Sequence, residues 1–286
     1  MAKYVPDVGS RRWVIIAPGR TARPSEDKKK KEETAPQCPF CVGNEHLTPP
    51  ELYRIGGGEK DMPGWQVRVV PNKYPITDTH EVIIHSTDDT LDIEDLPVEQ
   101  VTRILMAYRD RYRAHDDAGQ VLIFCNHGFA AGASLKHPHS QLVVIPKQIN
   151  LDAVSREPVA NVVEDNTYFV TYCPDFSQWP FEVWIAPKVA GGGKFSGITD
   201  GEITDLARVL QNALRRIRSV QTAGNVRSVH EGAFVYNFYI SHADNWFIRI
   251  TPRFVHRAGF ELGTGLNVNV IDPTEAAKIL KEVAVG

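Results

Sequence analysis

The stretch LKHPHSQLVVIP, residues 135–146, places two histidines, a serine and a glutamine directly before an unbroken apolar run. A short continuous apolar run is typical of a buried strand. Because side chains alternate along a strand, His137, His139 and Gln141 are expected on one face. Ser140 is then expected on the other face. The sequence therefore predicts two imidazoles and an amide lined up at the start of a buried strand.

A glycine-rich segment, NHGFAAGASLK (residues 126–136), comes just before the histidines. Gly128 and Gly132 would let the backbone approach a ligand closely and present N–H groups to it, as in many phosphate sites. An imidazole beside such a loop can attack phosphorus and form a covalent phosphohistidine. A lone histidine is more simply interpreted as a structural, hydrogen-bonded residue. Two histidines with Gln141 behind this loop favour chemistry at phosphorus instead.

The segment CPFC (residues 38–41) is a second chemical signal. Two thiolates at this spacing suit one tetrahedral zinc ion, although they supply only half of its ligands. A redox pair is the alternative, but the βαβ context of such pairs is missing. Cys125 and Cys173 lie inside apolar runs and are expected to be small buried hydrophobes.

The elements that must position these residues follow one another in a regular order. The predicted strands of the first half are WQVRVVPN (65–72), HEVIIHS (80–86), QVLIFCNH (120–127) and SQLVVIP (140–146). A helix is predicted over 95–115, because apolar residues such as Val101, Ile104 and Leu105 recur at three- to four-residue spacing.

The second half repeats this order. The predicted strands are TYFVTYC (167–173), FEVWIAP (181–187), AFVYNFYIS (233–241) and NWFIRITP (245–252), with a helix over 199–220. Repeated order favours an α+β fold of two tandem units with antiparallel sheets and covering helices, able to share one sheet. We assign residues 1–150 and 151–286 to the two units. Only the first carries the histidines, which predicts one site per chain, in the N-terminal unit.

Composition limits the classes of function. The chain has 286 residues, 42% of them hydrophobic, and a net charge of −3, so it can form a core and gives no electrostatic reason to expect nucleic acid as a partner. No run is long and apolar enough for a signal-peptide core or a membrane span, which favours a cytoplasmic protein. Residues 24–37, PSEDKKKKEETAPQ, are expected to form a solvated loop.

These motifs, in this order, resemble galactose-1-phosphate uridylyltransferase and its relatives, a branch of the histidine triad superfamily with two tandem copies of the triad fold. The resemblance covers nearly the whole chain, and NHGFAAGASLKHPHSQ, similar to the catalytic core, is its most specific part. CPFCVGNE resembles the family's zinc dithiol, and RVVPNKYP its base- and ribose-contacting segment. RRWVIIAPGRTARP is similar to the opening strand and paired arginines.

The resemblance implies a role for each matching residue. His139 would be the nucleophile that takes the nucleotidyl group, Gln141 would hold a phosphoryl oxygen of the intermediate, and Ser134 would act with them. The implied nucleotide- and phosphate-binding residues are Arg20, Arg23, Asn72, Asn126, Ser134 and Gln141.

The resemblance also implies a zinc cofactor held by Cys38, Cys41 and His137. The family's fourth ligand is a histidine, where this chain has Asp89, and zinc accepts carboxylate oxygen. His85 is the other candidate, and a weak or empty site is the third alternative. The strand NWFIRITP lacks the histidines with which some members bind a second metal, so no second metal site is expected.

The segment GFELGTG (residues 259–265) resembles the part of the family that contacts the hexose, with Phe260 and Glu261 at the sugar. In the family this segment reaches the partner subunit's site, which implies a homodimer. Its GTG ending is more similar to relatives that act on ADP-glucose.

Together these features predict a nucleotidyltransferase of carbohydrate and galactose metabolism. It would move a nucleoside monophosphate group from UDP-glucose to galactose 1-phosphate through a covalent nucleotidyl-histidine. The alternative is an ADP-glucose or dinucleoside polyphosphate phosphorylase or hydrolase, with phosphate as a possible acceptor. Gln141 stands where triad hydrolases carry a third histidine, which favours transfer over hydrolysis. A non-catalytic nucleotide-binding regulatory protein is a further alternative, disfavoured by the presence of all the active-site residues together.

Overall fold

The computed structural model describes residues 2–7, 12–22, 37–149, 151, 158–188, 193–230, 232–242 and 244–285. The strands are β1 (Lys3–Asp7), β2 (Arg12–Ile16), β3 (Tyr53–Gly56), β4 (Trp65–Pro71), β5 (Thr79–Ile84), β6 (Gln120–His127), β7 (His139–Ile145), β8 (Val162–Asp165), β9 (Phe169–Tyr172), β10 (Val183–Pro187), β11 (Tyr236–Ile240) and β12 (Ile248–Pro252). The α-helices are α1 (Val98–His115), α2 (Asp200–Thr222), α3 (Gly259–Thr264) and α4 (Pro273–Glu282).

One antiparallel sheet runs through the described part of the chain, in the order β3-β4-β5-β7-β6-β11-β12-β10-β9-β8. The order of the first five strands is repeated, from the opposite edge, by the last five. The two halves meet where β6 pairs with β11, so that Asn126 faces Asn237 and His127 faces Tyr236. The α+β class is confirmed, and both predicted units contribute to a single sheet.

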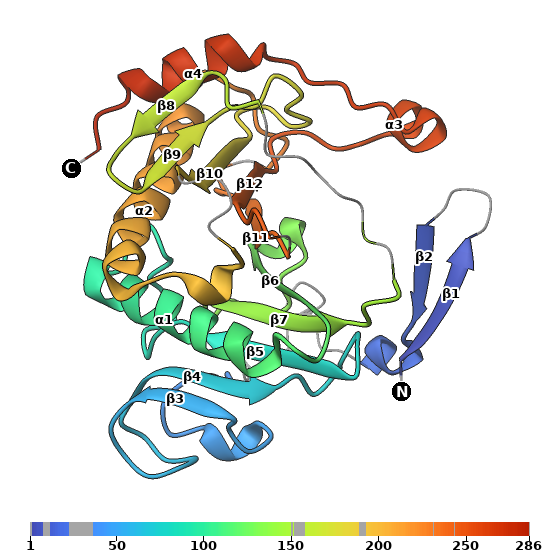
Figure 1. The fold of residues 1–286 in the computed structure, drawn as a ribbon, viewed down its shortest axis with the longest axis vertical. Helices are drawn as coiled ribbons and strands as arrows, with labels where there is room; N and C mark the ends of the chain where they lie inside the picture. Colours follow the sequence, from blue (N-terminus) through green and yellow to red (C-terminus); the bar gives the residue numbers. More distant parts are fainter. Residues whose placement is uncertain are drawn as a thin grey trace.

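The two long helices cover one face of this sheet (Figure 1). The main hydrophobic core lies between the two helices and the sheet. It includes Leu105 and Leu210 from the helices and Leu142 and Ile250 from the strands. Helix α2 begins with a capping box between Thr199 and Glu202, which satisfies the first N–H groups. The opposite face of the sheet carries smaller clusters, and this face holds the candidate site.

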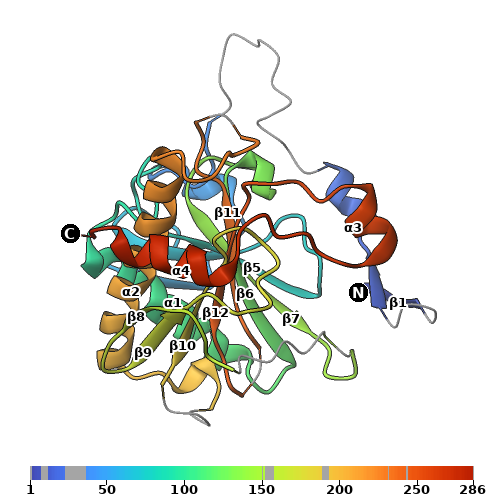
Figure 2. The same ribbon diagram turned by 90° about the horizontal axis from the view of Figure 1, so that it is seen from above.

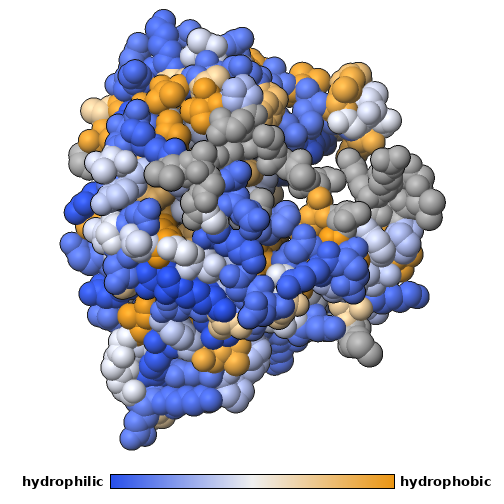
Figure 3. All heavy atoms as spheres, in the orientation of Figure 1, coloured by the Kyte–Doolittle hydropathy of each residue, from blue (hydrophilic) through white to orange (hydrophobic). Residues whose placement is uncertain are grey.

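A hairpin and a short helix project from the body on the side away from α1 and α2 (Figures 1 and 2). The hairpin is β1–β2, and Val14 and Ile16 are exposed on it. The segment around α3 also exposes apolar side chains, and Figure 3 shows hydrophobic residues at this projection. Its exposed apolar residues are Phe260, Leu262, Leu266, Val268 and Val270. Among the described helices, none has both the length and the apolar character needed to cross a bilayer.

Candidate active site

The start of β7 places His139 and Gln141 on the sheet face opposite α1, as the alternation predicts. Both side chains are buried, at 7% and 3% exposure. His139 Nδ1 lies 2.9 Å from the backbone carbonyl oxygen of His137, which can only accept a hydrogen bond. His139 therefore carries its proton on Nδ1, and Nε2 bears the lone pair that a nucleophile needs.

Ser140 points to the other face, toward α1, and completes a buried polar network there. Tyr108 donates to Ser140 Oγ, and His85 Nε2 lies 2.7 Å from the same oxygen. Burial lowers the pKa of His85 well below its usual value, and burial raises that of Tyr108, so both are neutral at pH 7. His85 Nε2 is thus hydrogen-bonded to Ser140 on the helix-covered face of the sheet.

Cys38, Cys41 and His137 come together as a group that could hold a metal ion. His137 Nδ1 lies 3.7 Å from Cys38 Sγ and 3.6 Å from Cys41 Sγ. Zn–S and Zn–N bonds of ordinary length separate S and N by about 3.6 Å across a tetrahedral zinc ion. His137 Nε2 donates to the Ser86 carbonyl at 2.9 Å, which leaves Nδ1 facing the thiols.

The charge of this donor set also fits a cation. Burial, then the neighbouring Cys38 thiol and Asp89, raise the pKa of Cys41 to about 12. A bound cation would offset the repulsion between the Cys41 thiolate and its negatively charged neighbours, and it would favour deprotonation of the thiols. Asp89 Oδ2 lies 3.9 Å from Cys41 Sγ, whereas His85 is outside the group. Of the two candidate fourth ligands, Asp89 is the one beside the thiols.

Phe40, between the two cysteines, connects the CPFC loop to His139. Its ring packs edge-on against the imidazole of His139, with centroids 5.3 Å apart, and against His137 at 6.1 Å. Fixing the thiol loop therefore also restricts the orientation of His139.

The glycine-rich loop has the conformation that its composition predicts. Gly128 and Gly132 have φ of +83° and +93°, a region that other residues rarely adopt. Asn237, from the second half, donates to both Asn126 Oδ1 and the Ala131 carbonyl, at 2.8 and 2.9 Å. These bonds leave the Asn126 amino group as a donor beside the loop. Asn237 was missed by the sequence analysis, because its role depends on the β6–β11 pairing.

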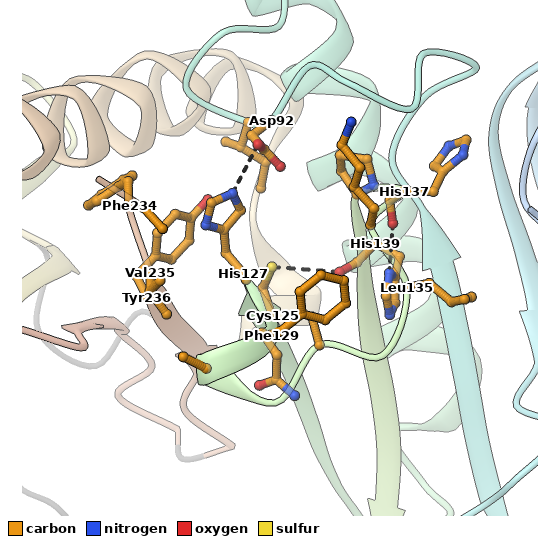
Figure 4. Close-up of a pocket in the computed structure, with 18 of the residues that line it drawn as sticks. Asp92, Cys125, His127, Phe129, Leu135, His137, His139, Phe234, Val235 and Tyr236 are labelled. Atoms are coloured by element: carbon orange, nitrogen blue, oxygen red, sulfur yellow. Dashed lines mark hydrogen bonds and ion pairs between the residues drawn. The ribbon is translucent and has the colours of Figure 1, made fainter. Parts of the chain in front are cut away.

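Two cavities flank His139, and both His139 and Leu135 line each of them. The larger, which we name the Asn126 cavity, has a volume of about 470 Å³ and is lined by Asn126, Phe129 and Lys136 among others (Figure 4). The smaller, the Asn72 cavity, has about 310 Å³. A side chain between two cavities can reach a bond that joins two parts of a ligand, when each part occupies a different cavity.

The far wall of the Asn126 cavity holds an ion pair that the sequence analysis did not single out. His127 Nε2 lies 2.9 Å from Asp92 Oδ2, and its ring stacks on Tyr236 with centroids 4.5 Å apart (Figure 4). Burial opposes the charged form, yet the hydrogen bond and charge of Asp92, with Glu94, raise the pKa of His127. This favours a cationic imidazole at the cavity wall.

The Asn72 cavity gathers predicted residues from separate parts of the chain. Ser134, Gln141 and Asn72 line it together with Phe40 and Tyr74. The structure therefore brings His139, Gln141, Ser134 and Asn72 to one place, and Asn126 to the adjoining cavity.

Other predicted residues do not line these cavities. Arg20 donates to the Tyr74 carbonyl at 2.8 Å, next to the Asn72 cavity, and Arg23 is outside the described residues. Phe260 and Glu261 lie on the projecting α3 and line neither cavity. Glu261 accepts a hydrogen bond from the Ala258 backbone N–H at 3.0 Å.

Sequence comparisons place these features among known proteins. Residues 74–145 match the family model described as galactose-1-phosphate uridyl transferase, N-terminal domain. An ADP-glucose phosphorylase from Arabidopsis thaliana is 28% identical, over 97% of this chain and 92% of the relative. A galactose-1-phosphate uridylyltransferase from Thermotoga maritima is 24% identical, over 96% of each chain.

Solved structures agree. A crystal structure of an Arabidopsis thaliana ADP-glucose phosphorylase with bound ADP-glucose superposes with a TM-score of 0.73 at 26% identity, covering 100% of both chains. A uridylyltransferase structure superposes with a TM-score of 0.74 at 22% identity, covering 98% of both chains, which shows a shared fold.

Proposed function

We infer that the chain belongs to the galactose-1-phosphate uridylyltransferase family, within the histidine triad superfamily. From that membership we propose that it transfers a nucleoside monophosphate group from a nucleoside diphosphate sugar to a phosphate-bearing acceptor, with His139 as the covalent nucleophile. The observation that carries the proposal is the Nδ1 hydrogen bond of His139 to the His137 carbonyl, beside Gln141 and between two cavities.

In the first step, His139 Nε2 attacks the α-phosphorus while the nucleoside occupies the Asn72 cavity. The bond from phosphorus to the bridging oxygen breaks, and sugar 1-phosphate leaves through the Asn126 cavity. Negative charge on the phosphoryl oxygens would be met by the amino groups of Gln141 and Asn126 and by loop N–H groups. The His137 carbonyl stabilises the positive charge that develops on the imidazole. Arg20, Arg23 and Ser134 are proposed phosphate contacts.

In the second step, an acceptor phosphate oxygen attacks the nucleotidyl-histidine, and His139 leaves as a neutral imidazole. This returns the enzyme to its starting state by a ping-pong path. Cys38, Cys41 and His137, with Asp89 beside them, would hold zinc, which would supply a structural cross-link rather than a reacting group.

We propose ADP-glucose and inorganic phosphate as the substrates, supported by the near full-length similarity to an ADP-glucose phosphorylase. Uridylyl transfer from UDP-glucose to galactose 1-phosphate is the second candidate, supported by the Thermotoga maritima relative. The two candidates share the first step and differ in base and acceptor.

The protein is proposed to act as a homodimer, in which Phe260 and Glu261 contact the sugar in the partner's site. Support comes from the exposed apolar residues around α3 and from the separation of α3 from this chain's own cavities. A hexose hydroxyl would then meet the Glu261 carboxylate across the subunit interface.

The test uses the isolated nucleotidyl-enzyme. Protein is labelled separately with ADP-glucose and UDP-glucose, freed from donor, and mixed with phosphate or galactose 1-phosphate. Rapid discharge of an adenylyl-enzyme by phosphate is expected. Discharge of a uridylyl-enzyme by galactose 1-phosphate, with no reaction toward phosphate, would replace this assignment with the second candidate. Absence of any labelled protein would overturn nucleotidyl transfer itself.

A further inference from the structure

His80 is a buried residue of β5 that contacts Gln141 on the sheet face of the active site. Its side chain is 4% exposed. In the β5–β7 pairing Val82 lies opposite Gln141 and His80 lies opposite Val143. His80 is therefore the diagonal neighbour of Gln141, close enough for long side chains to touch. His80 Nε2 lies 3.0 Å from Gln141 Oε1.

The protonation of His80 is fixed by a backbone donor. The Ile76 N–H donates to His80 Nδ1 at 3.0 Å, so Nδ1 must be an acceptor. A ring that accepts at Nδ1 carries its single proton on Nε2. The bond between His80 and Gln141 therefore runs from His80 Nε2–H to Gln141 Oε1, which identifies the amide oxygen of Gln141.

Asn72 supports the same arrangement. The Tyr74 N–H donates to Asn72 Oδ1 at 2.8 Å, which turns the Asn72 amino group toward Gln141. Asn72 Nδ2 lies 3.5 Å from Gln141 Oε1 and 3.1 Å from His80 Nε2. Asn72 Nδ2 and His80 Nε2 thus both donate to Gln141 Oε1. Because they share this acceptor, the two nitrogens also lie close to each other.

We propose that His80 is a positioning residue that fixes the Gln141 amide with its oxygen toward the protein and its amino group toward the ligand. Without this bond, the amide can rotate by 180° and present an oxygen to a phosphoryl oxygen, which repels it. The Ile76 N–H sets the tautomer of His80, and His80 in turn orients the Gln141 amide. The oriented amide then donates to the phosphoryl group. The inference rests on the proposed role of Gln141 in nucleotidyl transfer.

The experiment compares His80→Phe, which removes both ring nitrogens, with His80→Gln, which can return a donor near the position of Nε2. We expect His80→Phe to lower the rate of nucleotidyl-enzyme formation at saturating donor by roughly tenfold or more, with a smaller change in KM. His80→Gln should recover a large part of the rate. His115→Gln, in a histidine that contacts Glu81 on the helix side, is the matched control and should keep the wild-type rate.

A double-mutant cycle separates positioning from packing. In a Gln141→Ala background there is no amide to orient, so adding His80→Phe should change the rate by less than about twofold. A further tenfold loss in that background would overturn the proposal, as would a wild-type rate for His80→Phe. If Gln141→Ala alone left the rate unchanged, the proposed function of Gln141 would fail instead, and the two failures are distinguishable.

A second measurement uses only the wild-type protein, so it does not depend on whether a variant folds. Imidazole ¹⁵N chemical shifts of His80 in the wild-type protein should report a neutral ring protonated at Nε2. A ring protonated at Nδ1 would contradict the proposal, because it could not accept the Ile76 N–H.

Discussion

The two halves of the sheet use the same strand order and the same helical cover, but they differ on the face opposite the helices. In the N-terminal half this face carries His80, His139 and Gln141 beside cavities. In the C-terminal half the corresponding face carries a buried, largely aromatic cluster. Trp184 stacks on Phe247 with centroids 4.2 Å apart and an interplanar angle of 7°. Chemistry in this fold therefore depends on what the open face carries, since the framework itself is common to both halves.

The C-terminal half also contains a buried ion pair on that face. Arg249 Nε lies 2.7 Å from Glu182 Oε1, and Arg249 Nη2 donates to Glu182 Oε2 at 3.0 Å. Glu182 further accepts from the Trp184 indole N–H. Both charged side chains are buried and are paired with each other within the protein. In the N-terminal half, by contrast, the contacts within the protein are made by the amide oxygens of Gln141 and Asn126, and their amino groups are the proposed donors to a ligand.

The largest effect is expected when the proposed nucleophile of the N-terminal half is removed. His139→Ala should lower nucleotidyl-enzyme formation by at least about 10³-fold, while the donor Kd stays within about tenfold, since a nucleophile acts mainly after binding. Rapid-quench labelling and calorimetric binding measure the two quantities. Asn245→Ala is the matched control, because Asn245, like His139, lies seven residues before its strand-closing proline. Turnover that persists in His139→Ala would remove His139 from this role.

The buried ion pair should affect stability rather than chemistry. Glu182→Ala leaves Arg249 buried without its partner, which should lower the free energy of unfolding by about 3 kcal/mol. The combined change Glu182→Leu with Arg249→Met should restore much of it, because an apolar pair avoids desolvating charges. Denaturant unfolding measures both. A folded Glu182→Ala protein that no longer forms the nucleotidyl-enzyme would show that the C-terminal face takes part in the reaction.

Metal binding is expected in one half only. The purified chain should contain about one zinc ion, and Cys41→Ser should lose it and reduce activity by roughly tenfold, through the loss of order at His137 and Phe40. Cys173→Ala, in a buried cysteine of the other half, should keep the metal. Elemental analysis and steady-state rates provide the comparison. A metal-free wild-type protein with full activity would make the CPFC group unnecessary.

The smallest effect concerns Glu261, where the C-terminal half is proposed to reach a partner's site. Glu261→Ala should slow discharge of the nucleotidyl-enzyme by hexose 1-phosphate by an amount equivalent to about 1 kcal/mol, the value of a polar contact to the sugar. Discharge by phosphate should be nearly unchanged, because phosphate has no sugar hydroxyls. Equal slowing with both acceptors would mean that Glu261 acts only by accepting the Ala258 N–H at the start of α3.

The sequence predicted most of the sheet, because the long strands have clear apolar runs and the two long helices have clear periodicity. It did not predict β3 and β8, nor β1, α3 and α4. The first two are four-residue strands at the sheet edges, too short for a reliable pattern. The division at residue 150 stays a prediction, because the strands of both halves form one continuous sheet.

The proposed reacting residues His139 and Gln141 could be suggested from the sequence, because they lie close together in the chain and follow a glycine-rich loop. Their supports could not. His80 contacts Gln141 only through the β5–β7 register, and Asn237 reaches Asn126 only through the β6–β11 register. The family motifs therefore suggest the nucleophile, whereas the bonds that orient its neighbours can be found only from the fold.

The proposed mechanism requires that a covalent nucleotidyl group forms on His139 and nowhere else. The direct test is to incubate the wild-type protein with ADP-glucose or UDP-glucose without acceptor, quench without acid, digest, and locate the added mass by tandem mass spectrometry. We expect one nucleoside monophosphate per chain, on the peptide that contains His139, and none on any peptide of the C-terminal half. A group on another residue, or complete substrate turnover with no adduct at any time, would contradict it.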